Sequence, residues 1–231
     1  MKSKVLLLAC LMIFAGCDSD DAVQEEMQLD FSFNFATGTE GWIGGFSDYP
    51  AGEEDFYELE FEHSQLPEPL NTQEAALKLS GNNHSDDLFM YVTKQISGLQ
   101  PNKEYKMKFE VNFASNVADG QFGIGGSPGE SVYLKAGGAS HEPQNIEDEF
   151  GWYRLNVDKG NQAEGGDDMM VIGNFANGTE ENVYTLKTLY FPSAQTVMTN
   201  DAGELWLLFG VDSGFEGTTT IYINSIKIAL F

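Results

Sequence analysis

A short polar loop at residues 81–87, Gly-Asn-Asn-His-Ser-Asp-Asp, carries the side chains of this sequence that are best suited to chemistry. It holds His84, Asp86 and Asp87, and an apolar run begins directly after it at Leu88. Carboxylates and planar amides bind sugar hydroxyls, and a carboxylate pair can hold Ca²⁺ through its oxygens. Asn, Asp and Gly also suit a tight turn, in which the side chains bond to nearby backbone amides. The sequence therefore predicts either a ligand-binding lip or a turn that leads into a strand.

Two further loops combine glycine with carboxylates, at residues 157–170 and 210–219. Neither fits the twelve-residue calcium loop of the EF-hand, which needs oxygen ligands at fixed positions and a central glycine. Carboxylates from both loops could still meet around one ion. We predict a Ca²⁺ site whose ligands are Asp158, Asp168, Asp212 and Glu216.

Aromatic and acidic residues at loop borders complete the candidate site. Aromatic rings stack on sugar rings, although a buried tryptophan such as Trp42 would equally plug the end of a β-sandwich. Glu130 opens a strand after a Gly-rich loop, so it is the first candidate acid if the protein is an enzyme. The predicted ligand-binding residues are Trp42, Tyr49, His84, Asp86, Asp87, Glu130 and Trp152.

No catalytic residue is predicted. The chain has no Gly-x-Ser-x-Gly elbow, and its Gly-rich stretch at residues 123–130 lacks the Lys-Ser/Thr ending of a phosphate-binding loop. Glycoside cleavage needs two carboxylates, but with 36 acidic residues such a pair arises by chance.

The elements that position these loops are strands. Residues 104–115 alternate apolar and polar side chains with a period of two, as a strand with one buried face does. Similar runs separated by turn residues predict about ten strands in a two-sheet sandwich. The other predicted strands cover residues 31–35, 57–62, 75–80, 88–96, 131–136, 153–157, 184–190, 205–211 and 219–230. The long loops are predicted at residues 42–56, 123–130, 137–149 and 160–168.

Three stretches resemble a known group of domains. Phe-Asn-Phe-Ala-Thr-Gly-Thr-Glu-Gly-Trp at residues 33–42, Leu-Gln-Pro-Asn-Lys-Glu-Tyr at 99–105 and Thr-Thr-Ile-Tyr-Ile-Asn at 219–224 resemble the first, central and last strands of carbohydrate-binding modules and other galactose-binding-like jelly rolls. The resemblance implies an all-β fold, a single jelly-roll β-sandwich of two antiparallel sheets, and a glycan ligand. Such a fold also serves other functions.

The N-terminus has the layout of a secretory signal. Lys2 and Lys4 precede an apolar run at residues 5–14, and Phe-Ala-Gly-Cys at residues 14–17 resembles the lipobox of bacterial lipoproteins. The resemblance implies cleavage before Cys17 and acylation of that cysteine. We therefore predict a lipoprotein signal peptide at residues 1–16, an acidic flexible tether at 17–28 and the jelly-roll domain at 29–231.

The charge of the chain limits its partners. The formal net charge is −24, with 12 basic and 36 acidic residues. Nucleic-acid binding needs clustered Lys and Arg, so nucleic acid is excluded as a partner, and contact with a membrane is expected through the lipid on Cys17 only.

Together these features predict a lipoprotein anchored to the bacterial cell envelope, at the outer membrane and facing outward. Its expected function is that of a non-catalytic binding module for glycan, with Ca²⁺ as a candidate ion. Two alternatives remain: a polysaccharide-active enzyme that uses Glu130 with Asp86 or Asp87, and a structural or adhesion protein with a protein partner.

Overall fold

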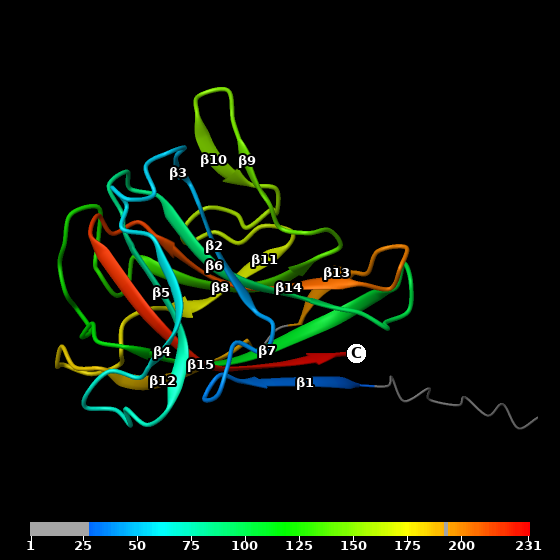
Figure 1. Ribbon diagram of the computed structural model, residues 1–231, viewed down its shortest axis with the longest axis horizontal. Coiled ribbons are helices and arrows are strands. Elements are labelled where there is room, and N and C mark those ends of the chain that lie inside the picture. The colour runs from blue at the N-terminus through cyan, green and yellow to red at the C-terminus, as the bar shows by residue number, and fades with distance from the viewer. Residues whose placement is uncertain (1–27, 192–193) are drawn as a thin grey trace, which may run out of the picture.

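The computed structural model describes residues 28–191 and 194–231, and its secondary structure consists of β-strands (Figure 1). The predicted signal peptide and the predicted lipidation site Cys17 lie outside the described residues, as does nearly all of the predicted tether. Within the described ranges there is no helix with the length and apolar character needed to cross a membrane.

The larger sheet, sheet A, has seven antiparallel strands. The central strand β15 pairs with β7 on one side, and on the other side with β5 along its first half and β1 along its second. Strand β4 lies at one edge beside β5, and β12 and β13 both pair with β7 at the other. The bounds are β1 Leu29–Asn34, β4 Glu60–Gln65, β5 Ala75–Asn82, β7 Glu104–Ser115, β12 Thr185–Tyr190, β13 Gln195–Met198 and β15 Thr218–Leu230.

The second sheet, sheet B, has five antiparallel strands in the order β11-β8-β14-β6-β2, and a small third sheet has the order β3-β10-β9. The bounds in sheet B are β2 Ile43–Ser47, β6 Leu88–Ile96, β8 Val132–Ala139, β11 Met169–Asn174 and β14 Leu205–Ser213. Those in the third sheet are β3 Tyr49–Pro50, β9 Asn145–Glu147 and β10 Trp152–Leu155.

Sheets A and B pack face to face. The chain passes from one sheet to the other at each step from β5 to β8, and again from β14 to β15. The core side of β7 buries Tyr105, Met107 and Phe109, while Lys106 and Lys108 between them are exposed. Each large apolar side chain buried in this way stabilises the fold by about 1.5–3 kcal/mol. The predicted all-β, antiparallel sandwich is confirmed.

The outer face of sheet B is covered as well. Phe89, Tyr91 and Leu208 point away from the main core and form a second apolar cluster with Leu155 and Val157 from the segment around β10. Figure 1 shows β9 and β10 projecting beyond sheet B as a separate ribbon. Because the first part of β6 is buried on both faces, residues 88–92 form a continuous apolar run rather than an alternation.

The prediction of a long loop at residues 42–56 is wrong in part, because β2 and β3 lie within it. Gly44 and Gly45 gave this stretch the composition of a loop. In the structure a Cβ at Gly44 would overlap the Phe61 ring, and one at Gly45 would overlap the Tyr91 ring. Close packing against aromatic rings therefore explains both glycines. Strands β9, β11 and β13 were also not predicted.

Candidate functional site

The loop at residues 81–87 forms a turn that is hydrogen-bonded to residues 213–215. Asn83 is buried, and its Nδ2 donates hydrogen bonds to the carbonyls of Ser213, at 2.8 Å, and Phe215, at 3.0 Å. Its Oδ1 accepts from the backbone N–H of Ser85 at 3.1 Å. The Asn83 amide therefore joins the turn between β5 and β6 to the end of β14, as the turn alternative predicts.

His84 and Asp86 remain at the surface of this turn. The His84 ring stacks on Phe56 with 4.1 Å between ring centroids, and its Nε2 lies 3.1 Å from the Phe56 carbonyl. Asp86 has a positive φ of 63°, which Asp tolerates better than most residues, and its carbonyl accepts from Gln162 Nε2 at 2.8 Å.

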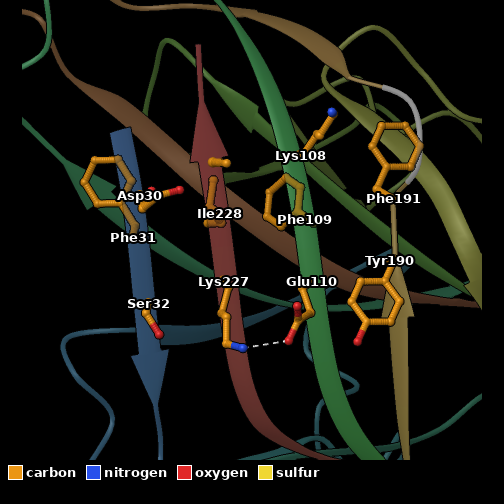
Figure 2. A pocket seen from close by; sticks show the side chains of 11 residues that line it. Asp30, Phe31, Ser32, Lys108, Phe109, Glu110, Tyr190, Phe191, Lys227 and Ile228 are labelled. Atoms are coloured by element: carbon orange, nitrogen blue, oxygen red, sulfur yellow. Dashed lines mark hydrogen bonds and ion pairs between the residues drawn. The ribbon is translucent and has the colours of Figure 1, made fainter. Parts of the chain in front are cut away.

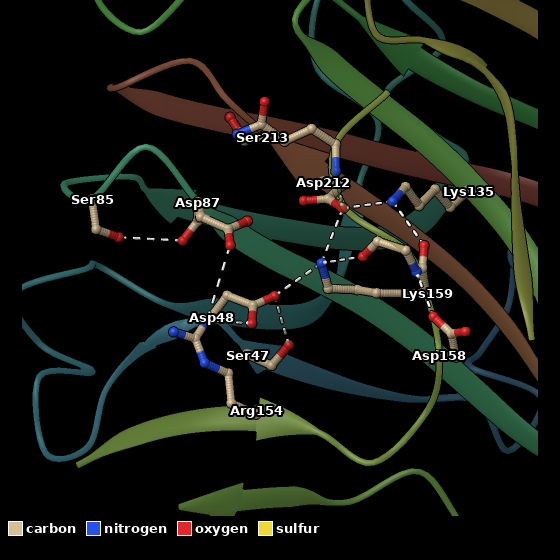
Figure 3. Close-up of polar contacts among 12 residues, drawn as sticks. Ser47, Asp48, Ser85, Asp87, Lys135, Arg154, Asp158, Lys159, Asp212 and Ser213 are labelled. Carbon is tan, nitrogen blue, oxygen red and sulfur yellow. Dashed lines mark hydrogen bonds and ion pairs between the residues drawn. The ribbon is translucent and has the colours of Figure 1, made fainter. Parts of the chain in front are cut away.

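Asp87 points instead into a group of ion pairs between sheet B and its cover (Figure 3). We call this group the charged cluster. Its members come from the junction of β2 and β3, the turn before β6, β8, β10, the segment 156–168 and β14. They are Asp48, Asp87, Lys135, Arg154, Lys159 and Asp212.

Opposite charges alternate through the charged cluster. Lys135 Nζ lies 2.8 Å from Asp212 Oδ2, and Lys159 Nζ lies 3.0 Å from the same oxygen. Lys159 Nζ also lies 3.0 Å from Asp48 Oδ2. The other carboxylate oxygen of Asp48, Oδ1, accepts a hydrogen bond from the Arg154 guanidinium at 2.8 Å. The same Arg154 nitrogen lies 3.9 Å from Asp87 Oδ2. This chain of contacts ties the cover of sheet B to the sheet.

Burial shifts the pKa values of two members of the charged cluster, Lys135 and Asp87. Burial lowers the pKa of Lys135, although Asp212 opposes the effect. Burial and the nearby Asp48 raise the pKa of Asp87 to about 7, against the opposing effect of Lys159. Asp87 can therefore give or take a proton near neutral pH. One oxygen of Asp87 and one of Asp212 are buried without a hydrogen-bond partner among the described residues.

The predicted metal ligands are only partly brought together. Asp158 accepts from the backbone N–H groups of Gly160 and Asp167, at 3.1 Å each, and these bonds lower its pKa. Asp168 accepts from the N–H of Asp158 at 2.8 Å. Asp212 instead lies with two lysines. In residues 28–191 and 194–231 no group of three or more His, Cys, Asp or Glu is arranged to hold a metal ion. Neither Asp212 nor Glu216 joins such a group, and the Ca²⁺ site stays a prediction.

The Glu130 carboxylate is hydrogen-bonded within the loop that precedes β8. It accepts from the backbone N–H of Gly120 at 2.6 Å and from the Ser127 hydroxyl, and these bonds lower its pKa. Within the part of the chain that the structure describes, no hydrogen bond or ion pair joins Glu130 to Asp86 or Asp87. Glu130 is therefore held by Gly120 and Ser127, whereas Asp87 faces Arg154 in the charged cluster.

Two of the predicted aromatic contacts need correction. Trp42 is 1% exposed and packs edge-on against Phe33 and Phe35, with ring centroids 5.4 and 6.2 Å away. Tyr49 is also buried and packs between Tyr57 and Tyr153. Neither ring has a face free for a sugar. Trp152 is half-buried, and the Arg154 guanidinium lies 5.1 Å from its ring centroid.

An accessible hollow lies on the outer face of sheet A, opposite in the sandwich to the charged cluster. Its volume is about 380 Å³, and it crosses β1, β15, β7 and β12 (Figure 2). We call it the sheet A groove. Its solvent-facing side chains are Asp30, Ser32, Lys108, Glu110, Tyr190 and Lys227.

Four of these side chains form one row across the sheet. Ser32 pairs with Lys227, Lys227 with Glu110, and Glu110 with Tyr190 on successive strands. Lys227 Nζ lies 2.8 Å from Glu110 Oε1, and this hydrogen bond raises the pKa of Lys227. Tyr190 ends the row and is 64% exposed. The groove thus offers one open aromatic ring beside hydroxyl, ammonium and carboxylate groups.

The sequence pattern did not lead to this groove. The alternation in β7 predicted that Lys108 and Glu110 face solvent, but not which residues lie beside them. Tyr190 and Lys227 meet Glu110 only through the register of three strands that are far apart in the chain. The one available signal was Tyr190 itself, an aromatic at the end of a predicted strand.

No family model matches the chain, and no curated protein matches it. Among solved structures, the chain is similar to the K1 cleaved adhesin domain of Lys-gingipain from Porphyromonas gingivalis W83, with 12% identity over 87% of this chain and 97% of that chain and a TM-score of 0.38. It is similar to a carbohydrate-binding module with specific mannan recognition, at 11% identity over 88% and 98% with a TM-score of 0.39. It is also similar to a carbohydrate-binding module in complex with β-1,4-galactotriose. The sequence identity is 10% over 84% of this chain and 92% of that chain, and the TM-score is 0.37. Likeness at this level carries no argument about the ligand, which must come from the site itself.

Proposed function

We propose that this domain binds glycan without cleaving it, through the sheet A groove. The observation that carries the proposal is the open ring of Tyr190 at the end of a polar row in a hollow of about 380 Å³. An exposed aromatic ring provides a flat apolar face for the C–H groups of a sugar. Of the aromatic residues in the sequence prediction, Trp42 and Tyr49 are buried, and Trp152 is half-buried beside the Arg154 guanidinium.

The groups beside Tyr190 supply the polar half of such a site. The Lys227 ammonium and the Glu110 carboxylate hold each other in place at 2.8 Å, and Ser32 adds a hydroxyl. A sugar hydroxyl both donates and accepts, so a donor and an acceptor fixed side by side can bind it at both atoms. Ligand sites commonly combine an apolar surface with a few fixed polar groups.

The test is a glycan-array screen followed by isothermal titration with the best oligosaccharide. We expect Tyr190→Ala to abolish binding and Tyr190→Phe to retain much of it, because the ring face is kept. Phe150 is the matched control: it is an exposed aromatic outside the groove, so Phe150→Ala should bind normally. Equal binding by wild type and Tyr190→Ala would reject the sheet A groove as the site.

We also propose that the chain is a lipoprotein of the bacterial envelope, anchored through Cys17 at the outer membrane and facing outward. The pattern of residues 1–17 supports this proposal. Expression of the full chain in a Gram-negative host should place it in the detergent phase of a Triton X-114 partition. Cys17→Ser should move it to the aqueous phase, and protease treatment of intact cells tests the outward orientation.

One observation favours a second candidate function, cleavage of polysaccharide. Asp87 combines a pKa of about 7 with partial exposure, as a general acid requires, and Asp48 lies beside the same arginine. Glu130, the other acid of the sequence alternative, is committed to its own loop. Release of reducing ends from a bound glycan, lost in Asp87→Asn, would favour this function. Binding without any release would leave the non-catalytic function standing.

A further inference from the structure

The sheet A groove differs in charge from the rest of the protein. The chain has a formal net charge of −24, yet the groove carries two acidic residues, Asp30 and Glu110, and two lysines, Lys108 and Lys227. A polyanion approaching most of this surface meets net repulsion. The groove is a place where that repulsion is locally cancelled.

Three lysines whose ammonium groups make no ion pair or hydrogen bond within the described residues lie close together in the sequence. Of the ten basic residues after residue 28, seven use their charged groups in ion pairs or in hydrogen bonds to carbonyls within the described residues. These are Lys78, Lys94, Lys135, Arg154, Lys159, Lys187 and Lys227. The ammonium groups of the other three, Lys103, Lys106 and Lys108, have no such contact in the described ranges. All three lie at the start of β7 or just before it.

Lys108 is the member of this trio that lines the groove. It is exposed, it pairs across the sheet with Ala229, and its Nζ lies 5.0 Å from the Phe231 ring centroid. It stands two residues from Glu110 on β7, a separation of about 7 Å along a strand. Figure 2 shows Lys108 and the row of Glu110 and Tyr190 at successive levels of the same hollow. An ammonium therefore lies one step along the groove from the aromatic ring.

We propose that the ligand of the sheet A groove is an acidic glycan, whose sugars carry carboxylate or sulfate groups, and that Lys108 binds the anionic group. This inference rests on the proposed glycan-binding function. A sugar stacked on Tyr190 would place a neighbouring sugar near Lys108, where an anion gains an ionic hydrogen bond without displacing a protein carboxylate. Lys227 is not equivalent, because Glu110 already neutralises it.

The test is isothermal titration of the full chain with three oligosaccharides of equal length: oligogalacturonate, a sulfated galactan fragment and a neutral galactan fragment. We expect at least one acidic probe to bind about two- to fivefold more tightly than the neutral one, because Lys108 is exposed and a solvent-exposed ion pair changes affinity by up to about that factor. The preference should shrink as salt is raised, because the groove is open to solvent. Comparing the affinities for oligogalacturonate and for the sulfated fragment shows whether the groove prefers carboxylate or sulfate groups.

Lys108→Gln should remove the preference and leave binding of the neutral probe intact. Lys78→Gln is the control, because Lys78 lies on sheet A outside the groove, paired with Glu60 and Glu62 at 2.7 and 3.0 Å. Equal binding of neutral and acidic probes by wild type, or a preference that survives in Lys108→Gln, overturns this inference but not glycan binding. Failure of every probe and of the glycan array overturns both.

Discussion

Lys135 on β8 and Asp212 on β14 form a salt bridge of 2.8 Å in which both side chains are 0% exposed. The same ammonium donates to the carbonyls of Lys159, at 2.8 Å, and Glu164, at 2.9 Å. All three of its protons are thus used, two of them by the segment that covers sheet B. This pair is therefore one of the contacts that hold the cover on sheet B.

We predict that Asp212→Ala destabilises the protein by about 3–5 kcal/mol, because it leaves two lysines near each other without their shared carboxylate. Urea denaturation followed by tryptophan fluorescence measures the loss. The control is Glu62→Gln, which weakens an exposed ion pair and should cost less than about 1 kcal/mol. Equal effects of the two substitutions would contradict a structural role for the charged cluster.

The pH dependence of stability should reveal Asp87. Its pKa is about 7 in the folded protein and near 3.8 when unfolded, so the folded state binds the proton more tightly. Asp87 therefore lowers stability as pH rises from about 4 to 7, and its full penalty remains above 7. We expect Asp87→Asn to raise the melting temperature at pH 8, with the gain shrinking through pH 7 and vanishing near pH 4.

Asp86→Asn is the matched control for this experiment. Asp86 is exposed, and Asn tolerates the same positive φ. The melting temperature of the Asp86→Asn variant should therefore equal that of wild type at every pH. A gain in Asp87→Asn that does not change between pH 4 and 8 would show that ionisation of Asp87 is not its cause.

Periodicity predicted the sandwich because strands such as β7 are buried on one face only. It did not predict the cover of sheet B, since β6 has apolar side chains on both faces and its pattern does not tell what covers the second face. The sheet A groove was not predicted because it depends on how the strands pair. Residues 32, 110, 190 and 227 form a row only when four strands are in register, and single-strand patterns carry no register.

The charged residues of the turn at 81–87 were recognised, but their roles were not. Asp87 acquires its raised pKa from burial and from Asp48, which is 39 positions earlier in the chain. Its cationic neighbours, Arg154 and Lys159, come from a segment that was predicted only as a short strand and a loop. The contacts of the acidic loops could not be predicted either, because the fold brings the lysines and backbone amides to their carboxylates.

The glycines of β2 allow a direct test of the close packing between the sheets. A Cβ at Gly44 would overlap the Phe61 ring, so we expect Gly44→Ala to destabilise the protein by about 1–3 kcal/mol. Gly38→Ala is the control, because its Cβ would meet no atom within 4 Å. Thermal unfolding of both variants measures the difference. Similar melting temperatures would mean that β2 can shift to admit the methyl group.

Two aromatic substitutions separate the core from the binding surface. Trp42→Ala should cost about 3–5 kcal/mol, because the ring fills the space beside Phe33 and Phe35. Tyr190→Ala should leave stability within about 0.5 kcal/mol of wild type, since its ring is mostly in solvent, while glycan binding is lost. Urea denaturation and titration on the same samples provide both readings. If Tyr190→Ala instead unfolds the protein, Tyr190 supports the sheet rather than the ligand.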